Sequence, residues 1–191
     1  SGHDYLLLYY FYYPYYLAYA TGALENAGYK PMLVDAVTRD WTHEQTVELA
    51  KREGFDLIVI DTSTPSIMND IDVARKLKHA LPKSHITLVY THPTAMPEWT
   101  LNQAKEIDSV CRGEYDNTVI FLAQALEKGN QLSRTLEPGE LIPGISFRDG
   151  KGGFVHTGPA KLMEDLDGLP FVADIYMRHF GEELVKKYFY A

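Results

Sequence analysis

Three short polar segments of the sequence carry side chains that could bind a ligand, and each follows an apolar run. They are Thr62-Ser63-Thr64, Tyr90-Thr91-His92 and Gly113-Glu114-Tyr115. Hydroxyl groups both donate and accept hydrogen bonds, histidine is a common metal ligand, and glycine lets a ligand approach the backbone. Each segment continues into a helical pattern, and loops between strands and helices are where open parallel sheets bind ligands. The three segments therefore predict a binding site.

The same segments also have structural interpretations. Thr62-Ser63-Thr64 would serve as a helix N-terminus with Pro65 in the first turn, and this role can coexist with ligand binding. Gly113 and Glu114 would equally form a turn with an acid near a helix N-terminus. His92 precedes Pro93 and is interpreted as a turn residue rather than a metal ligand. No catalytic residue and no metal site is predicted.

A fourth candidate segment is rich in tyrosine and lies near the start of the chain. It comprises Tyr12, Tyr13, Tyr15 and Tyr16 with the following Leu17. Such rings fill cores and interfaces, stack on a flat macrocycle, or form exposed patches prone to aggregation, and the sequence leaves these alternatives open. As a stacking platform, the segment belongs to the predicted binding site.

The wider sequence alternates apolar runs with helical patterns in five successive units. The expected strands are residues 5–10, 31–36, 56–61, 86–89 and 107–111, and the expected helices are residues 17–27, 42–53, 67–81, 97–106 and 117–128. This alternation is typical of right-handed crossovers in a parallel sheet. It predicts an α/β fold with a five-stranded parallel, flavodoxin-like (Rossmann-like) sheet and helices on both faces.

The pattern changes after Gly129. Residues 145–148 and 153–156 flank Asp149-Gly150-Lys151-Gly152, which predicts a β-hairpin. Residues 166–171 are expected to form a linker and residues 175–188 a terminal helix. We therefore expect a binding domain over residues 1–128, and a hairpin, linker and helix over residues 129–191 that lead toward a further domain absent from this sequence.

Composition and charge exclude several classes of partner. The 191 residues carry a net charge of -8, which would repel nucleic acid and anionic lipid. Cys111 is the single cysteine, so this chain can form neither an internal disulfide nor a thiolate cage for zinc or an iron-sulfur cluster. A reducing, cytoplasmic setting is expected. The apolar residues 5–20 contain Pro14 and are too short to span a membrane, which needs about 20 residues.

Several segments, in this order and spacing, carry a resemblance to a known family. They are Leu17-Ala18-Tyr19-Ala20, Asp35-Ala36, Thr62-Ser63-Thr64, residues 91–98 and 112–118, Gly144-Ile145-Ser146-Phe147-Arg148, and residues 166–171. From about Leu17 to its end, the chain resembles the N-terminal cobalamin-binding domain of cobalamin-dependent radical S-adenosylmethionine proteins, many of which are methyltransferases or cyclases.

The resemblance implies cobalamin as the cofactor, with its corrin ring over the carboxyl edge of the sheet and its nucleotide tail among the strands. In that family the ring faces a radical domain whose iron-sulfur cluster cleaves S-adenosylmethionine. The cluster needs three cysteines, and this chain has Cys111 alone. The resemblance therefore implies a cobalamin module that partners a radical domain outside this chain.

The chain departs from the family pattern at two places. Residues 9–16 are mostly tyrosine where the family has a proline-rich turn, and Tyr90 stands where the family's fourth strand usually ends in glycine. Other cobalamin domains carry an Asp-x-His-x-x-Gly segment after the first strand, and none follows Tyr10 here. We therefore expect a corrinoid without a histidine lower ligand, leaving water, an apolar group or a tyrosine beneath cobalt.

Three other functions remain as alternatives. The chain could be an apo or engineered α/β scaffold in which the tyrosine-rich loop fills the cofactor site. A receiver-like signalling domain needs carboxylates after the first and third strands and a lysine after the fifth. Asp61 is present, but Arg112-Gly113 occupies the lysine position. A flavin carrier would need a first loop rich in Ser, Thr and Gly, which the tyrosines replace.

Overall fold

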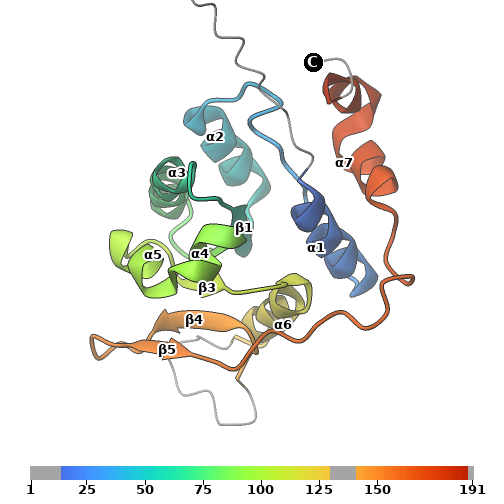
Figure 1. The fold of residues 1–191 in the computed structure, drawn as a ribbon. Coiled ribbons are helices and arrows are strands. Elements are labelled where there is room, and N and C mark those ends of the chain that lie inside the picture. Colours follow the sequence, from blue (N-terminus) through green and yellow to red (C-terminus); the bar gives the residue numbers. More distant parts are fainter. Residues whose placement is uncertain (1–13, 130–140, 189–191) are drawn as a thin grey trace, which may run out of the picture.

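A central sheet organises the computed structural model, which describes residues 14–129 and 141–188 (Figure 1). Its strands are β1 (Leu57–Asp61), β2 (His85–Val89), β3 (Ser109–Cys111), β4 (Ile145–Arg148) and β5 (Phe154–His156), and they lie side by side in this order. β1, β2 and β3 are parallel, as predicted, whereas β4 and β5 pair antiparallel. The prediction of a purely parallel sheet is therefore wrong, and the described sheet is mixed.

The hairpin explains the mixed sheet. Residues 145–148 and 154–156 form the predicted hairpin, and Val110 of β3 lies opposite Ser146 of β4. A strand at the edge of a sheet exposes unpaired backbone groups, and the hairpin supplies partners for those of β3. Because its two strands are joined by a tight turn, they must run antiparallel to each other.

The two strands predicted before residue 56 have different outcomes. Residues 5–10 lie outside the described part of the chain. Residues 31–36 form no strand, because their polar groups bind the C-terminal helix α7 (Val172–Lys187) instead of a neighbouring strand. The Leu33 amide donates to His179 Nδ1 at 3.1 Å, and the Tyr188 hydroxyl donates to Asp35.

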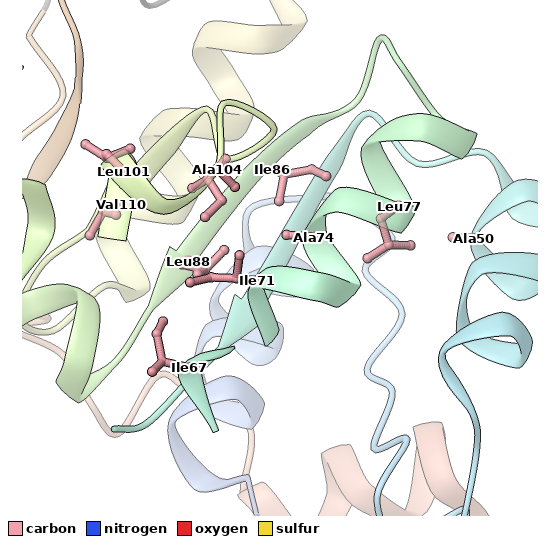
Figure 2. Packing of buried hydrophobic residues seen from close by; sticks show 11 residues of the cluster. Ala50, Ile67, Ile71, Ala74, Leu77, Ile86, Leu88, Leu101, Ala104 and Val110 are labelled. Atoms are coloured by element: carbon pink, nitrogen blue, oxygen red, sulfur yellow. The ribbon is translucent and has the colours of Figure 1, made fainter. Parts of the chain in front are cut away.

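One face of the sheet packs against α2 (His43–Glu53), α3 (Ile67–Ala80) and α5 (Pro97–Gln103). Figure 2 shows Ile71 of α3 beside Leu88 of β2 within this core. The apolar side chains of α3 recur at helical spacing, which is why this face was predictable. Thr42 begins α2 with a reciprocal capping box that it forms with Gln45.

The other face is covered by α1 (Tyr15–Asn26) and α6 (Asp116–Glu127), which pack against each other (Figure 1). Their core includes Val89 and Cys111 from the sheet and Leu122 from α6. α7 lies against the outer side of α1 and bends at Gly181. A short helix that was not predicted, α4 (Thr91–Ala95), follows β2 directly. None of the described helices has the length and apolarity that crossing a membrane requires.

Candidate functional site

The carboxyl ends of β2 and β3 meet at a cavity of about 220 Å³. It is lined by Tyr16 from α1, by the start of α4, and by the loop from β3 into α6. The complete lining is Tyr16, Tyr90, Thr91, Thr94, Gly113, Glu114, Tyr115 and Asp116. Loops that follow parallel strands converge at one edge of a sheet, and this convergence brings together segments about one hundred residues apart in sequence.

The predicted site residues divide into three groups. The cavity brings together Tyr16, Tyr90, Thr91, Gly113, Glu114 and Tyr115. It is not lined by Tyr15, Leu17, Thr62, Ser63, Thr64 or His92. Tyr12 and Tyr13 lie outside the described residues. The predicted positions after β2 and β3 thus face a common space, whereas those after β1 do not.

The segment after β1 has local partners that explain its absence from the cavity. Thr62 is almost fully buried and its hydroxyl donates to the Asp70 carboxylate of α3. The Ser63 amide donates to Ser66 Oγ at 3.1 Å. Thr64 Oγ1 lies 3.2 Å from His92 Nδ1. These local contacts hold the segment in a turn before α3, whose N-cap is Ser66. The interpretation of residues 62–64 as the helix N-terminus, with Pro65 in the first turn, is therefore wrong by a few residues.

His92 also lies beside the cavity rather than in its wall. Its ring packs edge-on against Trp99, with ring centroids 5.0 Å apart. Its Nε2 is buried without a hydrogen-bond partner among the described residues. No group of three or more acidic, histidine or cysteine side chains suited to a metal ion occurs in the described ranges.

Thr94 joins the two polypeptide segments that line the cavity. Its hydroxyl donates to the Tyr90 carbonyl at 2.6 Å and accepts from the Gly113 amide at 3.0 Å. The loop after β2 is thereby tied to the loop after β3. Thr94 was not among the predicted site residues, because its position four residues after Tyr90 becomes informative only once residues 91–95 are known to be helical.

Tyr115, which lines the cavity, forms a partly buried polar pair with Asp61. The Tyr115 hydroxyl donates to Asp61 Oδ2 at 3.1 Å, which links the loop after β3 to the end of β1. Burial raises the pKa of Asp61 to about 6, although the hydrogen bond from Tyr115 acts in the opposite direction. Burial, together with the nearby Asp61 carboxylate, also raises the pKa of the Tyr115 phenol, so this phenol stays protonated at neutral pH.

Asp116 is a second lining residue that the sequence analysis missed. It occupies the first turn of α6, where a backbone hydrogen bond favours its charged form. Burial outweighs this effect and, with the nearby Glu114, raises the pKa of Asp116 to about 6. Its carboxyl can therefore donate or accept a hydrogen bond near that pH. The sequence signal that could have identified Asp116 is its position, because it is an acid directly after the predicted segment Gly113-Glu114-Tyr115.

A second hollow of about 310 Å³ lies away from these loops. It is lined by Lys78, His79, Pro82, Lys105 and Glu106. Lys78 Nζ already donates to the Ser84 carbonyl at 2.6 Å and to Asp108 Oδ2 at 2.8 Å. Although it is the larger of the two, this hollow lacks the converging strand-to-helix loops that mark the carboxyl-edge cavity.

Comparison with known proteins identifies the family. Residues 7–122 match the family described as the B12 binding domain. The chain belongs to this family. Every residue that lines the cavity lies within the matched segment, so the cavity is part of a B12-binding domain. Cobalamin is accordingly the cofactor of the domain.

The domain is also similar to individual proteins. It is 29% identical over 157 residues to the anaerobic magnesium-protoporphyrin IX monomethyl ester cyclase of Cereibacter sphaeroides, covering 82% of this chain and 25% of that protein. It is 26% identical over 138 residues to an uncharacterized methyltransferase of Pyrococcus horikoshii, covering 72% of this chain and 28% of that protein.

A solved structure supports the fold. The apo form of OxsB, a cobalamin-dependent S-adenosylmethionine radical enzyme, matches with a TM-score of 0.64 at 14% identity, over 87% of this chain and 22% of that one. The chain thus spans about a quarter of the length of the relatives it matches. The shared fold is a Rossmann-like sheet with helices on both faces.

The cavity is too small to enclose a whole cobalamin molecule. Pockets that enclose a drug-sized ligand typically measure about 300–1,000 Å³, whereas this cavity measures about 220 Å³. Its rim offers the aromatic rings of Tyr16 and Tyr90, and the exposed Thr91 could hydrogen-bond an amide. A Cβ added at Gly113 would meet only Ala160 Cβ, at 3.9 Å, so the backbone there is accessible.

Proposed function

We propose that this chain is the cobalamin-binding module of a radical S-adenosylmethionine protein of the methyltransferase or cyclase type. The observation that carries the proposal is the cavity at the carboxyl ends of β2 and β3, inside a segment that belongs to the B12-binding family. The names of the relatives in Cereibacter sphaeroides and Pyrococcus horikoshii support the reaction type.

In this proposal the walls of the cavity hold the edge of the corrin, and the macrocycle lies over its mouth. Tyr16 and Tyr90 offer ring faces to the flat macrocycle, while Thr91 and Asp116 offer hydrogen bonds to its amide groups. Gly113 allows close approach to the backbone. Bound cobalamin supplies a cobalt centre able to carry a methyl group; the residues named here bind and orient it.

The lower face of cobalt receives no histidine from this chain in the proposal. His92 is the histidine nearest in sequence to the lining residues, but it does not line the cavity, and its Nε2 is buried, with no hydrogen-bond partner in the part of the chain that the structure describes. Water, an apolar group or a tyrosine then remains below the metal. A base-off visible spectrum is the expected signature.

The catalytic half belongs to a separate domain in this proposal. The iron-sulfur cluster and S-adenosylmethionine would bind there, because the single cysteine of this chain, Cys111, is buried and its pKa is raised to about 12 by that burial. We also propose that the cobalamin domain corresponds to residues 1–128, that residues 129–191 lead toward the radical domain, and that the protein works in the cytoplasm. Nucleic acid and membranes are not proposed partners.

One observation favours a second candidate, the closed scaffold. The Tyr16 and Tyr90 rings lie with their centroids 5.2 Å apart at the wall of the cavity. If these rings block the mouth, the chain would retain the family fold without its ligand.

Gel filtration with hydroxocobalamin separates the two candidates. The purified chain is mixed with excess hydroxocobalamin, and visible absorbance is followed through the protein peak. We expect a base-off chromophore to co-elute with the chain. A peak without chromophore would contradict the proposal and support the closed scaffold.

Two tryptophan variants locate the binding site. Thr91→Trp fills the cavity wall and is expected to weaken retention at least tenfold. Arg52→Trp is the matched control, because this exposed side chain lies at the C-terminal end of α2, away from the carboxyl edge. Equal losses in both variants would place the ligand elsewhere.

A further inference from the structure

Tyr90 adopts a backbone conformation that bulky residues rarely occupy. Its φ is 84° and its ψ is -153°, a region used almost only by glycine. The other non-glycine residue with positive φ in the described ranges is Asp40, at a φ of 54°. Aspartate tolerates such values through local hydrogen bonds, but a tyrosine does not have that option. Conformations of this kind cluster at ligand sites, where the surrounding structure maintains them.

The contacts that hold Tyr90 in this conformation also build the cavity. The Tyr90 carbonyl accepts hydrogen bonds from the Thr94 hydroxyl at 2.6 Å and from the Thr94 amide at 3.2 Å. The same hydroxyl accepts from the Gly113 amide at 3.0 Å. Thr94 and Gly113, which line the cavity, therefore also fix the strained backbone of Tyr90.

The consequence of this conformation is the position of the ring. The Tyr90 ring lines the cavity and packs on Tyr16 with an interplanar angle of 39°. Tyr16 is 53% exposed, so the pair presents aromatic surface to solvent at the cavity. A glycine would adopt this backbone conformation with less strain than Tyr90. It would, however, leave this surface with one aromatic ring instead of two.

We propose that Tyr90, assisted by Tyr16, is an affinity-determining residue whose ring contacts the flat face or edge of a large macrocycle. This inference rests on the proposed function, and it assigns to the strained tyrosine a direct share of the affinity for the corrin. Stacking contacts of aromatic rings contribute enough binding free energy to change affinity by about tenfold.

The test is the dissociation constant for hydroxocobalamin, measured by equilibrium dialysis. Tyr90→Phe retains the ring and is expected to bind within about twofold of the wild type. Tyr90→Leu keeps a bulky side chain without a flat ring, and Tyr90→Gly removes the side chain and the strain together. Both are expected to bind about tenfold more weakly. Wild-type or tighter affinity of Tyr90→Gly would overturn the inference, because the ring would then obstruct the ligand.

A second pair of variants keeps the inference testable if substitutions at Tyr90 do not fold. Tyr16→Leu removes the partner ring and is expected to weaken binding several-fold. Tyr19→Leu is its matched control on the same helix, since Tyr19 is 40% exposed and does not line the cavity. Equal affinities of these two variants would also overturn the inference. A wild-type chain that binds no hydroxocobalamin would overturn the proposed function, whereas a wild type that binds and is insensitive to both rings would overturn this inference alone.

Discussion

The half-buried carboxyl group of Asp61 gives the stability of the chain a defined dependence on pH. It lies at the end of β1, accepts a hydrogen bond from Tyr115 and has a second carboxyl group, Asp70, nearby. Burial disfavours its charged form and raises its pKa from 3.8 to about 6. In the unfolded chain the same carboxyl group is in water and titrates near its ordinary pKa.

The sign and size of the effect follow from this difference. Between pH 4 and pH 6 the folded chain holds a proton on Asp61 that the unfolded chain has released, so folding is favoured at the lower pH and stability falls as pH rises. A pKa that moves from 3.8 to about 6 corresponds to about 3 kcal/mol in total, of which about 2.5 kcal/mol is lost between pH 4 and pH 7.

Asp61→Asn tests this reasoning. The asparagine keeps an oxygen that can accept from Tyr115 but cannot ionise. We therefore expect the free energy of unfolding of the variant, relative to the wild type, to increase by about 2.5 kcal/mol between pH 4 and pH 7. Urea titrations of both proteins at pH 4, 5, 6 and 7 measure it. Asp116 and His85 also titrate abnormally here, and their contributions cancel in the difference between the two proteins.

Parallel stability profiles of the wild type and Asp61→Asn would refute this account of Asp61. They would mean that its carboxyl group is solvated in the folded chain. A relative stability that declines with pH would refute it more strongly, because it would show that the folded structure favours the charged form.

Four further substitutions test other parts of the structure, each by urea unfolding. Tyr115→Phe removes the donor to a carboxylate and is expected to cost about 2 kcal/mol at pH 8, and less at pH 4, where the acceptor is neutral. Gly144→Ala places a Cβ 2.7 Å from that of Ala160 at a φ of 79° and should cost about 3–4 kcal/mol. Gly150→Ala, at a similar φ with open space, should cost about 1 kcal/mol. Thr42→Ala removes the N-cap of α2 and should cost about 1 kcal/mol.

Each of these expectations has a clear contrary result. Equal losses for Tyr115→Phe at both pH values would show that the charge on its acceptor is irrelevant. Similar losses of stability for Gly144→Ala and Gly150→Ala would show that the contact with Ala160 contributes nothing. The positive φ alone would then explain both losses. An unchanged stability of Thr42→Ala would show that the capping box of α2 contributes nothing to folding.

The part of the fold near the cavity was predictable because its signals are local. β2 and β3 are short, buried apolar runs, and the polar segments that follow them begin with Tyr90 and Arg112. Parallel strands bring such segments to one edge, whatever the details of the side chains. The hairpin around Gly150 was predictable for the same reason, since its turn residues are contiguous in sequence.

The remaining features depend on partners that are distant in sequence. Residues 31–36 have the composition of a strand, but the Leu33 amide finds His179, far along the chain, as its acceptor. The hairpin joins β3 because an edge strand needs backbone partners, which no local pattern reveals. α4 was missed because Pro93 suggested a loop, although proline is tolerated in the first turn of a helix.

The site residues divide in the same way, into those with a local sequence signal and those that depend on partners distant in sequence. Thr91 and Gly113 could be predicted from their place after a strand, and both line the cavity. Thr64 occupies an equivalent place after β1 but is held by His92 outside the cavity wall. The strained backbone of Tyr90 could not be read from the sequence, because the hydrogen bonds from Thr94 that maintain it exist only in the folded chain.

Amide hydrogen exchange, with and without hydroxocobalamin, tests the central claim most directly by locating the ligand on the chain. The account predicts slower exchange in the segments 90–94 and 113–116, which contain the lining residues that follow β2 and β3, and unchanged exchange in residues 78–83 beside the second hollow. Protection confined to residues 78–83, or no protection anywhere at saturating hydroxocobalamin, would contradict it.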